Sequence, residues 1–161
     1  KAMMTTVHSY TADQNLQDAP HDDLRRARAA GQNIVPTTTG AAISIGEVIP
    51  DIKGKFDGLA IRVPTMVVSL TDFTFLLNRN VTVEDVNEAI ERASQEERFR
   101  GVLETTREPL VSSDFIGNPA SSTVDLSLTK VVDGNLVKVV AWYDNEWGYS
   151  ERLVDMALKV V

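Results

Sequence analysis

One stretch decides the fold of this chain, the run Met3-Met4-Thr5-Thr6-Val7-His8-Ser9-Tyr10-Thr11. Its β-branched and aromatic residues are typical of a β-strand. Side chains alternate between the two faces of a strand, which places Met4, Thr6 and His8 on one face. An imidazole held at the end of a strand titrates near neutrality and suits a general acid or base. A partly buried, hydrogen-bonded structural histidine is the alternative, and this stretch alone favours it.

Size and composition indicate one globular domain. The chain has 161 residues, of which 43% are hydrophobic, enough for a domain with its own core. The formal charge of −7 argues against nonspecific nucleic-acid binding, which needs a basic surface. We find neither an apolar run of membrane-spanning length nor a signal-peptide pattern, so we expect no membrane partner and a cytoplasmic location.

The sequence contains no cysteine. This excludes disulfides, thiolate metal sites and a cysteine nucleophile from these residues, and no metal site is predicted. The chain also begins directly on strand-like sequence. From this beginning we expect a portion of a longer protein.

A basic cluster interrupts this acidic chain at Arg25, Arg26 and Arg28. One interpretation is a short solvated helix in which Asp22 forms an ion pair with Arg26, four residues later. The other is an anion site or a subunit contact, because guanidinium groups match phosphate and carboxylate in shape and charge. The residues alone favour neither interpretation.

Two later segments offer places for an anion. The threonines of segment 36–40 precede a helix expected over 41–49, whose first N–H groups, near Thr39 and Gly40, suit a phosphate. Threonine N-capping is the commoner use of such residues. Within a strand expected over 56–63, Arg62 shares a face with small residues that leave room for a ligand, although a carboxylate such as Asp72 is an alternative partner.

The remaining pattern sets the fold class. We expect a strand over 67–77, a helix capped by Thr82, short extended pieces near 102–103 and 110–111, a hairpin of 122–129 with 136–143, and an amphipathic final helix. Adjacent and hairpin-linked strands predict an α+β fold, a mostly antiparallel twisted sheet with helices packed on one face. We expect one domain over residues 1–161. Neither of the glycine-rich nucleotide-binding spacings occurs.

Six motifs follow one another along the chain. They are Thr5-Thr-Val-His-Ser-Tyr-Thr11, Asp23-Leu-Arg-Arg-Ala-Arg-Ala-Ala30, Pro36-Thr-Thr-Thr-Gly-Ala-Ala42, Arg62-Val-Pro-Thr65, Val111-Ser-Ser-Asp-Phe115 and Trp142-Tyr-Asp-Asn-Glu-Trp-Gly-Tyr-Ser150. In order and spacing, this series closely resembles the catalytic domain of phosphorylating, NAD-dependent glyceraldehyde-3-phosphate dehydrogenase of bacterial type. The resemblance covers essentially the whole chain.

The resemblance implies roles for the residues already singled out. His8 is expected to activate the catalytic thiol and to carry the proton during hydride transfer. Thr11 and Arg62 are expected to bind the phosphate of the substrate. Thr39 and Gly40 are expected to bind inorganic phosphate.

Arg26 is implied as a further phosphate contact, Asn145 as the residue that holds the nicotinamide carboxamide of NAD, and Tyr149 as packing beside that ring. Glyceraldehyde 3-phosphate and inorganic phosphate are the implied substrates, and a homo-oligomer, a tetramer in the intact family, is the implied assembly.

Two features of the family are missing from these residues, the nucleophilic cysteine with its helix and the N-terminal NAD-binding domain. We therefore expect the chain by itself to be inactive and to bind NAD weakly or not at all. The alternatives are a non-catalytic folding or assembly module of the same scaffold, or an erythrose-4-phosphate dehydrogenase, which shares it.

Overall fold

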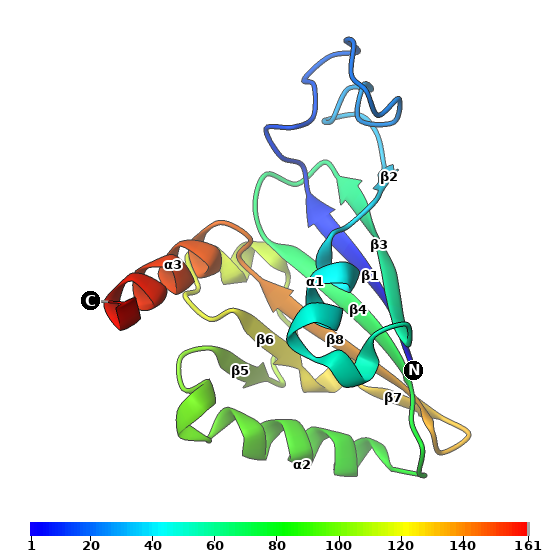
Figure 1. Cartoon of the computed structure of the whole chain (residues 1–161), viewed down its shortest axis with the longest axis vertical. Coiled ribbons are helices and arrows are strands. Elements are labelled where there is room, and N and C mark those ends of the chain that lie inside the picture. Colours follow the sequence, from blue (N-terminus) through cyan, green and yellow to red (C-terminus); the bar gives the residue numbers. More distant parts are fainter. Residues whose placement is uncertain (161) are drawn as a thin grey trace.

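The computed structural model describes residues 1–160, without the side chains at positions 42 and 43 (Figure 1). Eight strands form one sheet in the order β2-β3-β1-β4-β8-β6-β5, with β7 beside β8. The strands are β1 (Ala2–Ser9), β2 (Val35–Thr37), β3 (Phe56–Val63), β4 (Ser69–Leu76), β5 (Leu103–Thr106), β6 (Ser122–Asp125), β7 (Lys130–Val132) and β8 (Leu136–Tyr143). The α-helices are α1 (Ala41–Val48), α2 (Val83–Ser94) and α3 (Trp147–Val160).

The first strand lies between two partners, parallel to β3 and antiparallel to β4. The predicted face is confirmed, because Met4 and Thr6 are both buried. In the register of β1 with β3, His8 lies directly opposite Arg62. The two side chains that the sequence suggested for chemistry therefore share one face and one end of the sheet.

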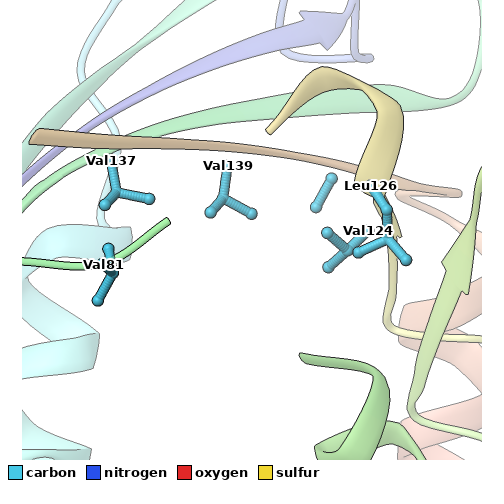
Figure 2. Close-up of a cluster of buried hydrophobic side chains, with 6 residues drawn as sticks. Val81, Val124, Leu126, Val137 and Val139 are labelled. Carbon is cyan, nitrogen blue, oxygen red and sulfur yellow. The ribbon is translucent and has the colours of Figure 1, made fainter. Parts of the chain in front are cut away.

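The predicted α+β class is confirmed. Most neighbouring strands are antiparallel, and only the β1–β3 and β5–β6 pairs are parallel. Helix α2 packs toward the sheet face that carries Val137 and Val139, over a core that also contains Val81, Val124 and Leu126 (Figure 2). Phe73 and Phe75 lie on that face and contact the cavities beside both α1 and α2. The two helices thus cover one face of the sheet.

Helix α2 begins where the sequence predicts. The Thr82 side chain accepts from the Asp85 N–H at 3.1 Å, and the Asp85 carboxylate accepts from the Thr82 N–H at 2.8 Å. This reciprocal capping box satisfies two of the N–H groups that a helix start leaves without partners.

Three details differ from the expected elements. The expected strand over 122–129 ends at Asp125, because a turn of 3-10 helix follows, and the hairpin partner of β8 is β7 instead. Residues 110–111 form no strand, and Val35–Thr37 form one that the sequence did not indicate. Asp133 and Gly134 do take positive φ, as the predicted turn requires.

The final helix forms but leaves much of its apolar surface exposed. Leu153, Val154, Met156, Leu158 and Val160 are each more than half exposed. Within residues 1–160, no helix has the length and apolar character that spanning a membrane would need.

Candidate active site

His8 is half-buried at the carboxyl end of β1. Its Nδ1 lies 2.6 Å from the Ser9 carbonyl oxygen, which can only accept, so Nδ1 carries the hydrogen. The neutral ring therefore keeps the lone pair of Nε2 for another partner. Burial lowers the pKa of His8, the hydrogen bond to Ser9 opposes this shift, and the charge of Arg62 reinforces it. At neutral pH the ring is thus an unprotonated base.

Arg62 joins this end of the sheet to the loop that follows β1. Its Nη1 donates to Thr11 Oγ1 at 2.6 Å and to Gln14 Oε1 at 3.2 Å. Burial and the nearby charge of Arg26 lower the pKa of Arg62, yet a guanidinium remains charged at neutral pH. The alternative partner Asp72 is wrong, since that carboxylate pairs with Lys138.

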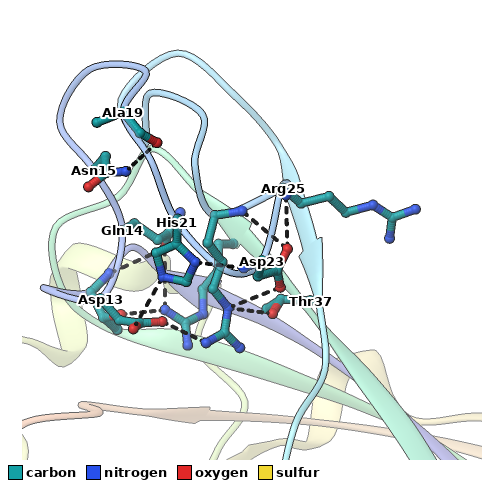
Figure 3. A network of polar contacts seen from close by, with 11 residues as sticks. Asp13, Gln14, Asn15, Ala19, His21, Asp23, Arg25 and Thr37 are labelled. Carbon is teal, nitrogen blue, oxygen red and sulfur yellow. Dashed lines mark hydrogen bonds and ion pairs between the residues drawn. The ribbon is translucent and has the colours of Figure 1, made fainter.

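The loop over 10–34 is held by a polar network (Figure 3). Arg26 donates to Asp13 at 2.6 Å and to Thr37 Oγ1 at 2.8 Å, and it lies 3.5 Å from Asp23. The hydrogen bond from Arg26 lowers the pKa of Asp13, and the bond from the Arg25 N–H lowers that of Asp23. The segment forms turns, so the short helix with an Asp22 ion pair is wrong. Arg26 is instead bound to carboxylates within its own loop.

Asn145 is fixed by two buried hydroxyls. Its Oδ1 accepts from Ser9 Oγ and from Ser69 Oγ, each at 3.0 Å. No other hydrogen bond of this side chain occurs among the described residues, so Nδ2 remains available as a donor. Ser69 follows Val68, whose φ of 71° is a strained value for a β-branched residue.

Asp144 anchors the loop that carries Asn145. Its carboxylate accepts from the N–H groups of Gly117 at 2.9 Å, Glu146 at 3.0 Å and Trp147 at 2.8 Å. Burial alone raises the pKa of Asp144, but these three bonds lower it overall. The stability that this group contributes is therefore present above the unfolded-state pKa of an aspartate and is lost as the pH falls below it.

Other predicted site residues form no hydrogen bond with the cluster of His8, Thr11, Arg62 and Asn145 in the described part of the chain. Thr39 Oγ1 accepts from the Ala41 N–H at 3.2 Å just before α1, whose N-cap residue Gly40 is exposed. Tyr149 is 65% exposed on α3. The hydrogen bonds recorded for residues 1–160 include none from these three residues to the cluster.

Some residues of the site were not indicated by the sequence. Ser69, Gln14 and Tyr143 reach the cluster from segments far apart in the chain, and no local pattern marks them. Tyr143 packs edge-on to His8, with ring centroids 6.2 Å apart, and burial raises its pKa. The described residues contain no group of three or more His, Asp or Glu placed to hold a metal ion.

Comparisons with known proteins found relatives of this chain. Residues 1–145 match the family described as "Glyceraldehyde 3-phosphate dehydrogenase, C-terminal domain". The chain is 58% identical over 158 residues to "Glyceraldehyde-3-phosphate dehydrogenase 1" of Streptomyces avermitilis, covering 98% of this chain and 47% of that protein. It is 55% identical over 157 residues to the glyceraldehyde-3-phosphate dehydrogenase of Geobacillus stearothermophilus, with 98% and 47% covered. The chain spans about half the length of the curated relatives it matches.

Proposed function

The chain belongs to the glyceraldehyde-3-phosphate dehydrogenase family, whose C-terminal domain it matches, and from this we propose that it supplies the substrate-binding and proton-transferring part of a phosphorylating, NAD-dependent aldehyde dehydrogenase. One observation carries the proposal. His8, Thr11, Arg62 and Asn145 meet at one end of the sheet, in a base, an anion-binding pair and an oriented amide.

The proposed reaction converts an aldehyde, inorganic phosphate and oxidised NAD into an acyl phosphate, NADH and a proton, by way of a cysteine thioester. These 161 residues hold no thiol, so a cysteine outside them provides the nucleophile. His8 Nε2 takes the proton from that thiol and gives it to the aldehyde oxygen as the thiolate adds to the carbonyl carbon. It takes the proton back from the resulting hydroxyl when the adduct is oxidised to the thioester. Arg62 and Thr11 bind the phosphate of glyceraldehyde 3-phosphate.

The residues present fit the nicotinamide end of NAD. The buried hydroxyls orient Asn145 so that its Nδ2 can donate to the carboxamide oxygen of the ring. Tyr149 is exposed and can pack beside the same ring. When bound, NAD accepts the hydride of the aldehyde.

Inorganic phosphate completes the proposed substrate set. The threonine-rich turn before α1, with Thr39 and Gly40, supplies hydroxyl and N–H donors for it, and Arg26 supplies a nearby charge. Arg26 is already paired with Asp13 and Asp23, which compensate its positive charge. It therefore attracts a phosphate less strongly than Arg62 does.

Replacing Arg62 with alanine is expected to weaken binding of glyceraldehyde 3-phosphate by about ten- to a hundredfold. Charge-assisted hydrogen bonds to phosphate contribute about 1.5–3 kcal/mol, which corresponds to that change in affinity. Isothermal titration calorimetry of the chain measures it directly. The matched control is Arg100→Ala, which removes an equal charge from an exposed side chain paired with Glu97. An unchanged dissociation constant for Arg62→Ala would contradict the assignment.

We also propose that the domain associates with further copies of itself. The same self-association is expected if the chain is a non-catalytic assembly module. The exposed apolar side chains of α3 support this, because large apolar patches favour association. Light scattering is expected to give a mass that rises with concentration, and Leu158→Glu is expected to reduce that rise. A monodisperse monomer over a wide concentration range would exclude self-association.

A further inference from the structure

Gln14 occupies a special place beside the proposed phosphate pocket. It ends the turn over 11–14, in which its backbone N–H donates to the Thr11 carbonyl at 2.9 Å. Its side chain folds back over the same turn, and Oε1 accepts from the Thr11 N–H at 3.3 Å. The same Oε1 accepts from Arg62 Nη1 at 3.2 Å, and Gln14 is only 7% exposed. One buried amide oxygen therefore links both members of the pocket.

The orientation of this amide follows from its neighbours. Two N–H donors converge on the same end of the Gln14 side chain, and the amide nitrogen has no capacity to accept from them. The end that faces Thr11 and Arg62 is therefore the carbonyl oxygen.

Arg62 and Arg26 differ in the charge of their partners. Arg26 is paired with two carboxylates, those of Asp13 and Asp23. Arg62 is held by a hydroxyl oxygen and by an amide oxygen, both uncharged. The positive charge of Arg26 is therefore compensated within the loop, whereas the acceptors that orient Arg62 leave its charge in place.

The pocket also holds more donors than acceptors. Arg62 Nε and Gln14 Nε2 are buried and have no acceptor among the described residues. Buried donors without partners are rare and costly, and an anion rich in acceptor oxygens suits such a site. Both recorded side-chain hydrogen bonds of Arg62 come from Nη1, so its Nη2 is not used by them.

We propose that Gln14 is a positioning residue for Arg62, which orients the guanidinium with an uncharged oxygen and so preserves its positive charge for a phosphate monoester. This inference rests on the proposed function, which assigns Arg62 and Thr11 to the phosphate of the substrate. It also gives a reason why an amide, and not a carboxylate, occupies position 14. A carboxylate would orient Arg62 equally well, but it would compete with the phosphate ligand for the positive charge of Arg62.

Two substitutions of similar size separate the effect of charge from that of the hydrogen bond. Gln14→Glu keeps an acceptor oxygen and adds a negative charge. Gln14→Met removes the acceptor and adds no charge. If the side chain served only as a hydrogen-bonded brace, glutamate would be the milder change. If it preserves the charge of Arg62, glutamate is the more harmful one.

The experiment titrates the chain with glyceraldehyde 3-phosphate, and with glyceraldehyde as the phosphate-free probe, by calorimetry. We expect Gln14→Glu to weaken binding of the phosphorylated probe by about tenfold or more, and Gln14→Met by about threefold. The control Gln95→Glu adds the same charge at an exposed position after α2 and is expected to change affinity by less than about twofold. Circular dichroism checks that each variant is folded.

Each outcome decides between the two proposals. Wild-type affinity in Gln14→Glu, or a larger loss in Gln14→Met than in Gln14→Glu, would overturn the role of Gln14 and leave the proposed function intact. A wild-type chain that does not distinguish the two probes would overturn both. Where Gln14→Glu fails to fold, Gln14→Met tests the positioning of Arg62, and a loss of affinity no larger than that of Gln95→Glu would overturn the role of Gln14.

Discussion

Replacing Gly58 with alanine is expected to unfold the chain or to destabilise it by about 3 kcal/mol. A Cβ at this position would lie 2.5 Å from the Met4 carbonyl oxygen and 3.0 Å from the Met4 Cβ. The first of these contacts is with backbone, in the register that pairs β1 with β3, so it cannot be relieved by turning a side chain. The strands would have to separate, and the same pair of strands places His8 opposite Arg62.

Chemical denaturation of the wild type and of Gly58→Ala measures this loss. The matched control is Gly46→Ala in the interior of α1, where the added Cβ would lie 3.7 Å from Lys53, at an ordinary van der Waals distance. The control is expected to raise stability by about 0.5–1 kcal/mol, because alanine restricts the unfolded chain and favours a helix. Equal unfolding midpoints for wild type and Gly58→Ala would show that the β1–β3 contact is not as close as described.

The sequence predicts the elements that have strong local signals. The strand over 56–63, the helix capped by Thr82 and the turn at Asp133–Gly134 are all confirmed, because alternation, a capping box and a turn pair act between near neighbours. The predicted pairing of 122–129 with 136–143 is confirmed in part, because β6 pairs antiparallel with β8. The strand that pairs with β8 next to the turn is β7, because a 3-10 segment ends the first strand and strand-like sequence resumes at 130–132.

The sequence predicts the site only in part. Alternation places His8 and Arg62 on one face of their strands, but only the parallel register brings them opposite each other. The oriented amide of Asn145 depends on Ser9 and Ser69, which lie 136 and 76 residues away from it in sequence. Contacts over such separations leave no periodic pattern. The same limit applies to Gln14, whose link to Arg62 spans 48 residues.

The largest expected effect concerns catalysis, because a polypeptide of these 161 residues is expected to form no NADH from glyceraldehyde 3-phosphate, phosphate and NAD. His8 Nε2 is available as a base, but no thiol is present for it to deprotonate. Nearby hydroxyls are poor substitutes, since a hydroxyl has almost no ionised fraction at neutral pH. The hydroxyl of Ser9, the next residue in the sequence, already donates to Asn145.

A fusion protein that supplies a cysteine and an NAD-binding domain tests whether activity can be restored. The N-terminal half of the Geobacillus stearothermophilus relative, joined before this chain, is expected to produce NADH under those conditions. In that fusion, His8→Asn is expected to lower kcat by about 10²–10⁴-fold, the usual contribution of a positioned base.

His21→Asn is the matched control, since His21 is the other of the two histidines and lies in the loop beside Asp13. It is expected to keep kcat within a few fold, because its ring interacts with Asp13 and with the Asp23 N–H of that loop. NADH formation by the 161-residue chain above its own His8→Asn variant would overturn the need for an external thiol, and equal kcat values for the two fusion variants would remove His8 from the chemistry.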